Sequence, residues 1–481
     1  MNKKDLFKLI DDKKDILIDL SDSIWEYAEL SLLEFKSAKH YIEVLKEEGF
    51  EVENEVAGIK TAFTGIYGSG RPIRGILGEF DALTGLSQEA CSVNRKELIQ
   101  GGCGHGCGHH LLGAGSLGAA IAIKKYLEDK GEGTGTVIFF GCPGEEGGAG
   151  KAFMARDGIF YNLDAALSWH PSDTNEVITG TNNCSIQVEY KFTGIASHAA
   201  GAPHMGRSAL DGVELLNIGV QFLREHIKDS DRIHYAIIDA GGNSPNVVQP
   251  TAKVLYMVRS NTVPETRKLL DRVDNIAKAA AMMSETTLTR RFIDGTANTI
   301  DNQILEDILY KNFEEIELPE YTEEEWTFAK ELKKSYFTDE LPGFGAIHNS
   351  EIARIVREKT DNGNMALNDF LMPKYHSSEQ SMGSTDVGDV SWQTPTGQIN
   401  TVTWTSGSPG HSWQNVSMGK SSIAHKGLFL AAKVLAATAF DLFEHPDVLE
   451  KAKEEFIIKT KDGYICPIEK DAVPTAIDNK F

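Results

Sequence analysis

The apolar and polar positions along the first part of the chain alternate between helical and strand-like patterns. Apolar residues recur at helical spacing over 4–30 and 36–48, which predicts two opening helices, and again over 111–127. Short apolar runs typical of buried strands lie at 61–67, 73–79, 136–140 and 165–168. Strands that alternate with helices predict an α/β domain with a mostly parallel sheet between helices.

The pattern changes near residue 186. Strand-like and helical segments then follow in the order β-α-β-β-α-β, at 185–192, 207–226, 233–238, 253–259, 265–282 and 285–292. Such a unit forms a small sheet of its own with helices on one face. We therefore predict an inserted domain at 186–295 and a discontinuous catalytic domain made of 1–185 and 296–481.

Composition and charge argue against binding to nucleic acid and against a membrane or exported protein. The 481 residues carry a formal net charge of −22, and no stretch gathers lysine and arginine into a stripe, so nucleic acid is not an expected partner. The opening segment has acidic residues within its apolar pattern, and no run of eighteen apolar residues occurs, so we expect no export signal and no membrane segment. The six cysteines are then expected to stay reduced in a cytoplasmic protein.

A segment rich in glycine, cysteine and histidine at 101–110 is the densest chemical signal. Cys107 and His109 are two residues apart, and an extended or glycine-rich loop lets both side chains point at one ion. Thiolate and imidazole are ligands that borderline-soft divalent metals favour. Cys103 and His105 repeat the spacing, which does not distinguish the two pairs, and a flexible glycine loop without a metal is the alternative.

Two adjacent carboxylates, Glu145 and Glu146, follow the strand-like run at 136–140 between glycines. Open α/β sheets place their active sites at the carboxyl ends of strands. One carboxylate there could bind a metal while its neighbour takes a proton from water, although a surface acidic turn is the alternative. His170 and His411 each follow a strand-like run. Either histidine alone could be structural, but the combination of thiolate, carboxylate and imidazoles predicts a metal site.

The order and wording of six motifs resemble the aminoacylase/carboxypeptidase-like family of dinuclear metallohydrolases, in its amidohydrolase branch. The motifs are Cys107-Gly-His-His110, Pro143-Gly-Glu-Glu-Gly147, Ser168-Trp-His-Pro171, Gly194-Ile-Ala-Ser-His-Ala-Ala200, Ser244-Pro-Asn-Val-Val248 and Pro409-Gly-His-Ser-Trp-Gln414. The resemblance runs from the opening helix to the tail around Cys466. It implies a metallopeptidase catalytic domain with an inserted lid and dimerisation domain.

The resemblance also implies roles for single residues. It implies two divalent ions, manganese or zinc, held by Cys107, His109, Glu146, His170 and His411, with Cys107 as the bridge and Glu145 as the general base. Many relatives begin the site with His-x-Asp, whereas this chain has Glu79-Phe-Asp81. Asp81 then matches the aspartate that orients the site, and the role of Glu79 stays open.

Residues of the inserted domain are expected at the substrate. His198 resembles the histidine that reaches a neighbouring subunit's site and donates to the developing oxyanion; capping a nearby helix is the alternative. Asn246 and Arg259 align with positions that hold a substrate carboxylate or carbonyl. The resemblance therefore implies a homodimer through the inserted domain, or a heteromer with a homologous subunit. Asp386 and Asp389 have no firm role, and support of His411 is one interpretation.

The implied activity is metal-dependent hydrolysis of an N-acyl amino-acid amide by activated water. The substrate implied by resemblance is p-aminobenzoyl-glutamate, a folate breakdown product, which would give p-aminobenzoate and glutamate. Other N-acyl amino acids or small dipeptides are the alternative. A metal-free binding subunit and a cysteine hydrolase using Cys107 are further alternatives, and metal analysis with chelation distinguishes them.

Overall fold

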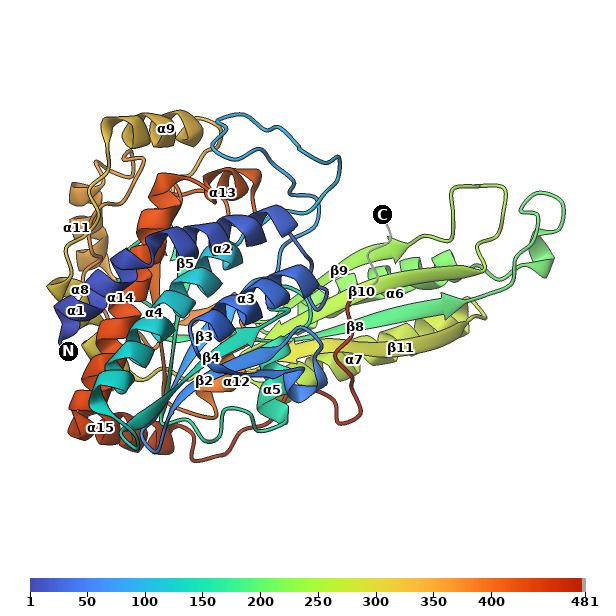
Figure 1. The fold of residues 1–481 in the computed structure, drawn as a ribbon. Coiled ribbons are helices and arrows are strands. Elements are labelled where there is room, and N and C mark those ends of the chain that lie inside the picture. Colours follow the sequence, from blue (N-terminus) through green and yellow to red (C-terminus); the bar gives the residue numbers. More distant parts are fainter. Residues whose placement is uncertain (478–481) are drawn as a thin grey trace.

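A seven-stranded sheet forms the centre of the larger lobe in the computed structural model, which describes residues 1–477 (Figure 1). Its strands, in spatial order, are β1 (Glu51–Asn54), β2 (Phe63–Ser69), β4 (Gly135–Cys142), β3 (Ile73–Glu79), β5 (Ala165–Ser172), β13 (Thr396–Val402) and β6 (Glu176–Val177). The central pairs from β4 to β13 are parallel, and the pairs toward both edges are antiparallel. The predicted α/β class is confirmed, but only the centre of the sheet is parallel. The short connection between β1 and β2 favours their antiparallel pairing, whereas the pairs β2–β4 and β13–β6 join segments that are distant in the chain.

Helices cover both faces of this sheet. One face packs against α4 (His109–Lys130) and α14 (Ser422–Glu444), with α1 (Lys3–Asp12), α2 (Lys14–Tyr27) and α3 (Phe35–Glu47) outside them. The other face packs against the short helices α5 (Gly150–Arg156) and α12 (Val387–Ser391). The long first helix predicted over 4–30 is wrong: the chain breaks at Lys13, within a charged run that offers no apolar side chain to the core.

Glycine lets α4 approach the sheet closely. A Cβ atom at Gly113 would lie 2.1 Å from the Tyr41 hydroxyl and 2.6 Å from the carbonyl oxygen of Glu79. Any side chain there would push α4 away from the end of β3. The close approach places the first residue of α4, His109, beside the last residue of β3, Glu79.

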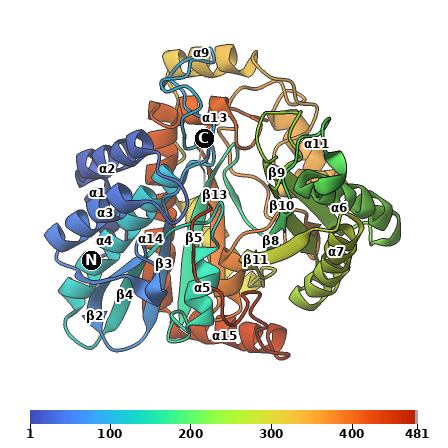
Figure 2. The same ribbon diagram turned by 90° about the vertical axis from the view of Figure 1, so that its right-hand side faces the viewer.

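The narrower lobe projects from the larger one (Figures 1 and 2) and holds an antiparallel four-stranded sheet in the order β11-β8-β10-β9. Along the chain its elements are β8 (Cys184–Thr193), α6 (Ala209–Leu223), β9 (Arg232–Asp239), β10 (Thr251–Ser260), α7 (Val263–Met283) and β11 (Thr287–Thr296). This is the predicted β-α-β-β-α-β order. Both helices pack on one face of the sheet, and the predicted boundaries at 186 and 295 fall within β8 and β11.

The remaining elements complete the larger lobe. They are α8 (Gln303–Glu315), α9 (Glu323–Lys333), α10 (Phe344–His348), α11 (Ser350–Lys359), α13 (Trp413–Met418), α15 (Pro446–Lys459) and the short parallel pair β7 (Thr181–Asn182) and β12 (Gln380–Ser381). None of the helices in residues 1–477 combines the length and the apolar composition needed to cross a bilayer.

Candidate active site

The predicted ligand residues gather at one edge of the large sheet. Glu145 and Glu146 follow β4, His170 lies in β5, and His411 lies in the loop after β13. These strands are parallel, so their carboxyl ends meet at the same edge, where open α/β sheets place ligands. His109, the first residue of α4, and Cys107, in the loop just before it, reach that edge.

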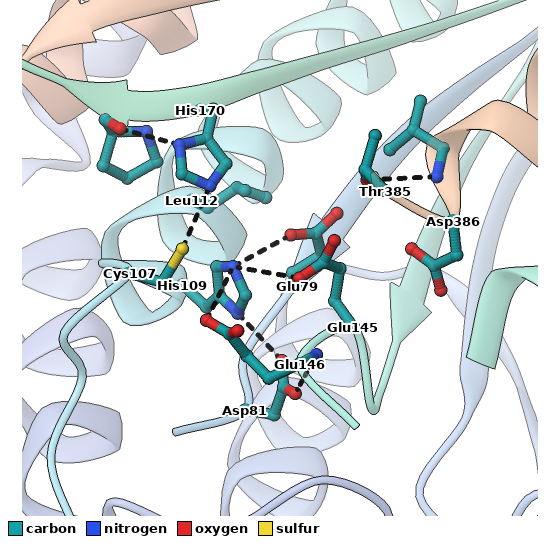
Figure 3. Close-up of polar contacts among 12 residues, drawn as sticks. Glu79, Asp81, Cys107, His109, Leu112, Glu145, Glu146, His170, Thr385 and Asp386 are labelled. Carbon is teal, nitrogen blue, oxygen red and sulfur yellow. Dashed lines mark hydrogen bonds and ion pairs between the residues drawn. The ribbon is translucent and has the colours of Figure 1, made fainter. Parts of the chain in front are cut away.

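Two groups of three donor side chains share Cys107. The first joins Cys107 to His109 and His170, and the second joins it to Glu146 and His411; within each group the donor atoms lie within 4.8 Å of one another. The Cys107 Sγ atom is 3.3 Å from His170 Nε2, and His411 Nε2 is 3.5 Å from Glu146 Oε2. Figure 3 shows the first group together with Glu146.

The donor set fits divalent metal ions. His109 Nε2 and Glu146 Oε1 are buried and make no hydrogen bond. Buried polar atoms without a partner are rare, and an ion is one group that satisfies them. Thiolate and imidazole are ligands that borderline-soft divalent metals favour, and a carboxylate adds an anionic oxygen donor. Of the two Cys-x-His pairs, only Cys107 and His109 lie in these groups; His105 instead donates to the carbonyl of Ile24, 3.0 Å away.

Asp81 orients this cluster through hydrogen bonds. His109 Nδ1 donates to Asp81 Oδ1 at 2.8 Å, which leaves Nε2 facing the donor groups. The other oxygen accepts from the Ser31 hydroxyl at 2.7 Å and from the Glu146 amide at 2.9 Å. Burial acts to raise the pKa of Asp81, but these hydrogen bonds and the charge of His109 lower it to about 2. The carboxylate therefore fixes both a histidine ring and the acidic loop.

Glu145 lies beside the donor groups in an environment suited to proton transfer. Burial, with the nearby charges of Glu79, Glu146 and Asp386, raises the pKa of Glu145 well above its usual range. Its Oε2 atom is 4.0 Å from His109 Nε2. A carboxylate with a raised pKa is a stronger proton acceptor than an ordinary one, and once protonated it can return the proton.

Sequence reasoning missed Lys151, whose side chain is fully buried behind Glu79. The Lys151 ammonium lies 2.8 Å from Glu79 Oε1 and 2.6 Å from Asp386 Oδ1. One signal could have found it, because a lysine inside the apolar segment 149–155, directly after the acidic loop, needs a buried partner.

Glu34 was also missed. This buried carboxyl accepts hydrogen bonds from the amides of Leu32 and Gly144 and from the Thr61 hydroxyl. Burial and the charge of Asp81 raise the pKa of Glu34 to about 8. The contact with Gly144 ties the segment before α3 to the loop that carries Glu145.

The proposed support of His411 by Asp386 and Asp389 is wrong. Asp386 pairs with Lys151, whose amide also donates to it at 2.8 Å. Asp389 accepts from the Tyr464 hydroxyl at 2.6 Å and from the Ala297 amide at 3.0 Å. Both aspartates lie in or beside α12. There they serve as buried acceptors for the Lys151 ammonium and for the amides of Lys151 and Ala297.

A cavity of about 500 Å³ lies between the two lobes and contains the cluster. The projecting sheet contributes one wall, including Gln187, Arg259 and Asp294. Arg259 donates to the Ser384 hydroxyl at 2.6 Å and makes no ion pair within residues 1–477. The guanidinium is therefore available to an anionic group in the cavity.

His198 and Asn246 do not line this cavity. Both are exposed on neighbouring loops of the projecting lobe, where the Ala199 amide donates to the Asn246 carbonyl at 2.9 Å. His198 Nδ1 accepts from the amides of Ala200 and Gly201, so its ring closes its own turn instead of capping a helix. Within one chain, His198 and Asn246 therefore do not contact the donor groups.

Comparisons with known proteins agree with this geometry. The model of peptidase family M20/M25/M40 matches residues 75–436. One of the subunits of p-aminobenzoyl-glutamate hydrolase from Escherichia coli is 40% identical over 98% of this chain and 100% of its own length. A human Xaa-Arg dipeptidase is 27% identical over 94% of this chain and 91% of its own length.

A solved structure shares the fold. A Bacillus subtilis protein described as a dinuclear metal binding peptidase from the M20 family superposes with a TM-score of 0.51 at 17% identity, covering 90% of this chain and 98% of that one. From the match of the family model and the 40% identical relative, this chain belongs to peptidase family M20/M25/M40, a family of hydrolases.

Proposed function

We propose that this chain is a metal-dependent amidohydrolase that cleaves p-aminobenzoyl-glutamate to p-aminobenzoate and glutamate. The observation that carries the proposal is the pair of donor groups sharing Cys107, with Glu145 beside them in a cavity between the lobes. The substrate is proposed from the E. coli relative, whose similarity extends over nearly the whole chain.

Two divalent ions, manganese or zinc, would occupy the donor groups. Cys107, His109 and His170 would hold one ion, and Cys107, Glu146 and His411 the other. When bound, such ions lower the pKa of water and polarise a carbonyl oxygen. The partnerless Nε2 of His109 and Oε1 of Glu146 support this assignment.

The chain's own residues would then move the proton and hold the substrate. Glu145 accepts the proton of the attacking water and delivers it to the leaving amine nitrogen. Asp81 keeps the His109 proton on Nδ1, so that Nε2 stays free. Arg259 pairs with a substrate carboxylate, because its planar guanidinium donates two parallel hydrogen bonds.

His198 and Asn246 would act on the site of a neighbouring subunit. Their exposure outside the cavity of their own chain supports this role. His198 would donate to the oxyanion that develops on the amide carbonyl, and Asn246 would bind beside it. The partner is either a second copy, joined through the projecting lobe, or a homologous subunit, and the designation of the E. coli relative as a subunit supports an assembly.

A substrate panel tests the proposal. Metal-loaded protein is given p-aminobenzoyl-glutamate, other N-acyl glutamates and dipeptides that end in arginine, the last because of the human relative. We expect the highest kcat/KM with p-aminobenzoyl-glutamate. Faster hydrolysis of the dipeptides would contradict the proposed substrate and favour a dipeptidase with the same site.

A further inference from the structure

The Lys151 ammonium is a buried charge that the reaction outlined above does not use. Its side chain is fully buried, and it lies 2.8 Å from Glu79 Oε1 and 2.6 Å from Asp386 Oδ1. A buried ammonium is stable only when it is paired, and removal of one partner from such a cluster leaves an uncompensated charge. The three side chains form one unit with one cation between two carboxylates.

Glu79 belongs to this unit and also faces the proposed metal site. Its Oε2 atom is 3.2 Å from His109 Nε2, and Glu79, His109 and Glu145 form a third group of donor atoms within 4.8 Å of one another. In Figure 3, His109 lies on one side of Glu79 and Asp386 on the other. By position alone, Glu79 is therefore able to become a further metal ligand.

We propose that Lys151 is a positioning residue that holds Glu79 out of the metal coordination. The ammonium pairs with Glu79 at its Oε1 atom, so the carboxylate is kept from joining the ion. A bound ion would then keep a position for water, as catalytic zinc sites require. This inference rests on the proposed metal site. It adds that the Lys151 ammonium limits which side chains bind the metal.

The proposal predicts the sign of a change in metal affinity. If Lys151 only supports the local fold, its loss lowers metal affinity, typically by about 10- to 100-fold for residues that support ligands. If Lys151 restrains Glu79, its loss frees a carboxylate beside the ion and removes a positive charge. Both effects attract a divalent cation, so affinity rises.

The main test is Lys151→Met combined with Asp386→Asn. This double variant keeps the net charge of the cluster and leaves only Glu79 unpaired. Affinity for Zn²⁺ is measured by competition with a chromophoric chelator, beside wild type and Asp386→Asn alone, in which the Lys151–Glu79 pair remains. We expect the double variant to bind about tenfold more tightly, with kcat reduced and KM little changed. Addition of Glu79→Gln should return the affinity toward the wild-type value.

A second variant keeps the test decisive if the double variant does not fold. Glu79→Gln is nearly isosteric and leaves Lys151 paired with Asp386. The visible absorption spectrum of its Co²⁺-loaded form should match that of the wild type, since Glu79 is not a ligand. A changed spectrum in Glu79→Gln would contradict the proposed role of Lys151, and so would weaker or unchanged Zn²⁺ affinity in the double variant. Either result would leave the proposed metal site intact. Wild-type protein that binds no divalent ion overturns the proposed metal site and this inference together.

Discussion

At the scale of single residues, Cys107 is the side chain that both proposed metal sites share. Its Sγ atom belongs to the group with His109 and His170 and to the group with Glu146 and His411. A shared ligand couples the two ions, whereas a residue at one end of the cluster affects only one of them. Removal of different ligands should therefore have unequal effects.

We predict that Cys107→Ala lowers the affinity for both ions, while His411→Ala lowers the affinity for one. The expected metal content after dialysis is near zero for Cys107→Ala and about one equivalent for His411→Ala, measured by elemental analysis. Cys103→Ala, in the neighbouring pair with the same spacing, is the matched control and should keep both ions. Equal losses in Cys107→Ala and His411→Ala would contradict a bridging cysteine.

Local sequence carried much of the information about this site. Glu146, His170 and His411 lie at or after strand-like runs, so they could be recognised from the chain as candidates. The glycine-rich segment also marked Cys107 and His109, but only the family resemblance separated this pair from Cys103 and His105. The apolar segment around Lys151 indicates a buried lysine, but its partners could not be assigned, because Glu79 and Asp386 lie 72 residues before it and 235 residues after it. Such a cluster exists only once the sheet and α12 are assembled.

At the scale of elements, the contact between α4 and β3 sets the position of His109. A Cβ atom at Gly113 would meet the Tyr41 hydroxyl and the backbone carbonyl of Glu79, which cannot move without shifting β3. At Gly118, on the same helix, the nearest atom would be the flexible end of Leu17, 2.9 Å away. The two glycines therefore differ in what a methyl group would displace.

Gly113→Ala should destabilise the fold by about 1–3 kcal/mol and weaken metal binding, because overpacking separates α4 from β3. Gly118→Ala should be tolerated, since Leu17 can rotate and alanine favours helix. Urea unfolding and Zn²⁺ affinity measure both effects. Similar behaviour of the two variants would contradict the close approach at Gly113.

Helix α12 contains Asp389, a buried carboxyl group whose protonation makes the stability of the fold depend on pH. Burial, with a smaller contribution from the charge of Asp386, raises the pKa of Asp389 from 3.8 to about 7, although the bonds from Tyr464 and Ala297 oppose this. Between about pH 4 and pH 7, the folded chain thus keeps a proton that the unfolded chain has released. The stability from this proton is complete at low pH and is lost as pH rises through 7.

We predict that Asp389→Asn removes this part of the pH dependence. As pH rises, the free energy of unfolding of the wild type should decrease more steeply than that of the variant. The difference in slope should be up to about 1.4 kcal/mol per pH unit. Urea titrations at several pH values between 5 and 7 measure the difference between the two proteins. A difference that is constant with pH would contradict a protonated Asp389.

At the scale of the whole molecule, the cavity is built from both lobes, but His198 and Asn246 lie outside it. The order of elements in both lobes could be predicted, because hydrophobic periodicity is a local property. The antiparallel edges of the large sheet could not, because they depend on how distant segments meet. The expectation that His198 acts on a neighbouring subunit came from the family resemblance and not from periodicity. If His198 acts as proposed, a complete site requires a second subunit.

Mixing two inactive variants tests that requirement. Glu145→Gln lacks the proposed base and His198→Ala lacks the proposed oxyanion donor, so each protein alone should have little activity. A hybrid dimer pairs the Glu145 of one subunit with the His198 of the other and so contains one intact site. We expect activity to return after subunit exchange, and each variant mixed with itself is the control. No recovery in verified hybrids would contradict action between subunits.

The most direct test of the account is hydrolysis of p-aminobenzoyl-glutamate by metal-stripped protein before and after addition of Mn²⁺ or Zn²⁺, beside Glu145→Gln. The account predicts no turnover without metal and recovery with metal. It also predicts that Glu145→Gln binds metal but loses activity by a factor of about 10² to 10⁴. Turnover that survives removal of the metal, or that persists in Glu145→Gln, would contradict hydrolysis by metal-activated water with Glu145 as the base.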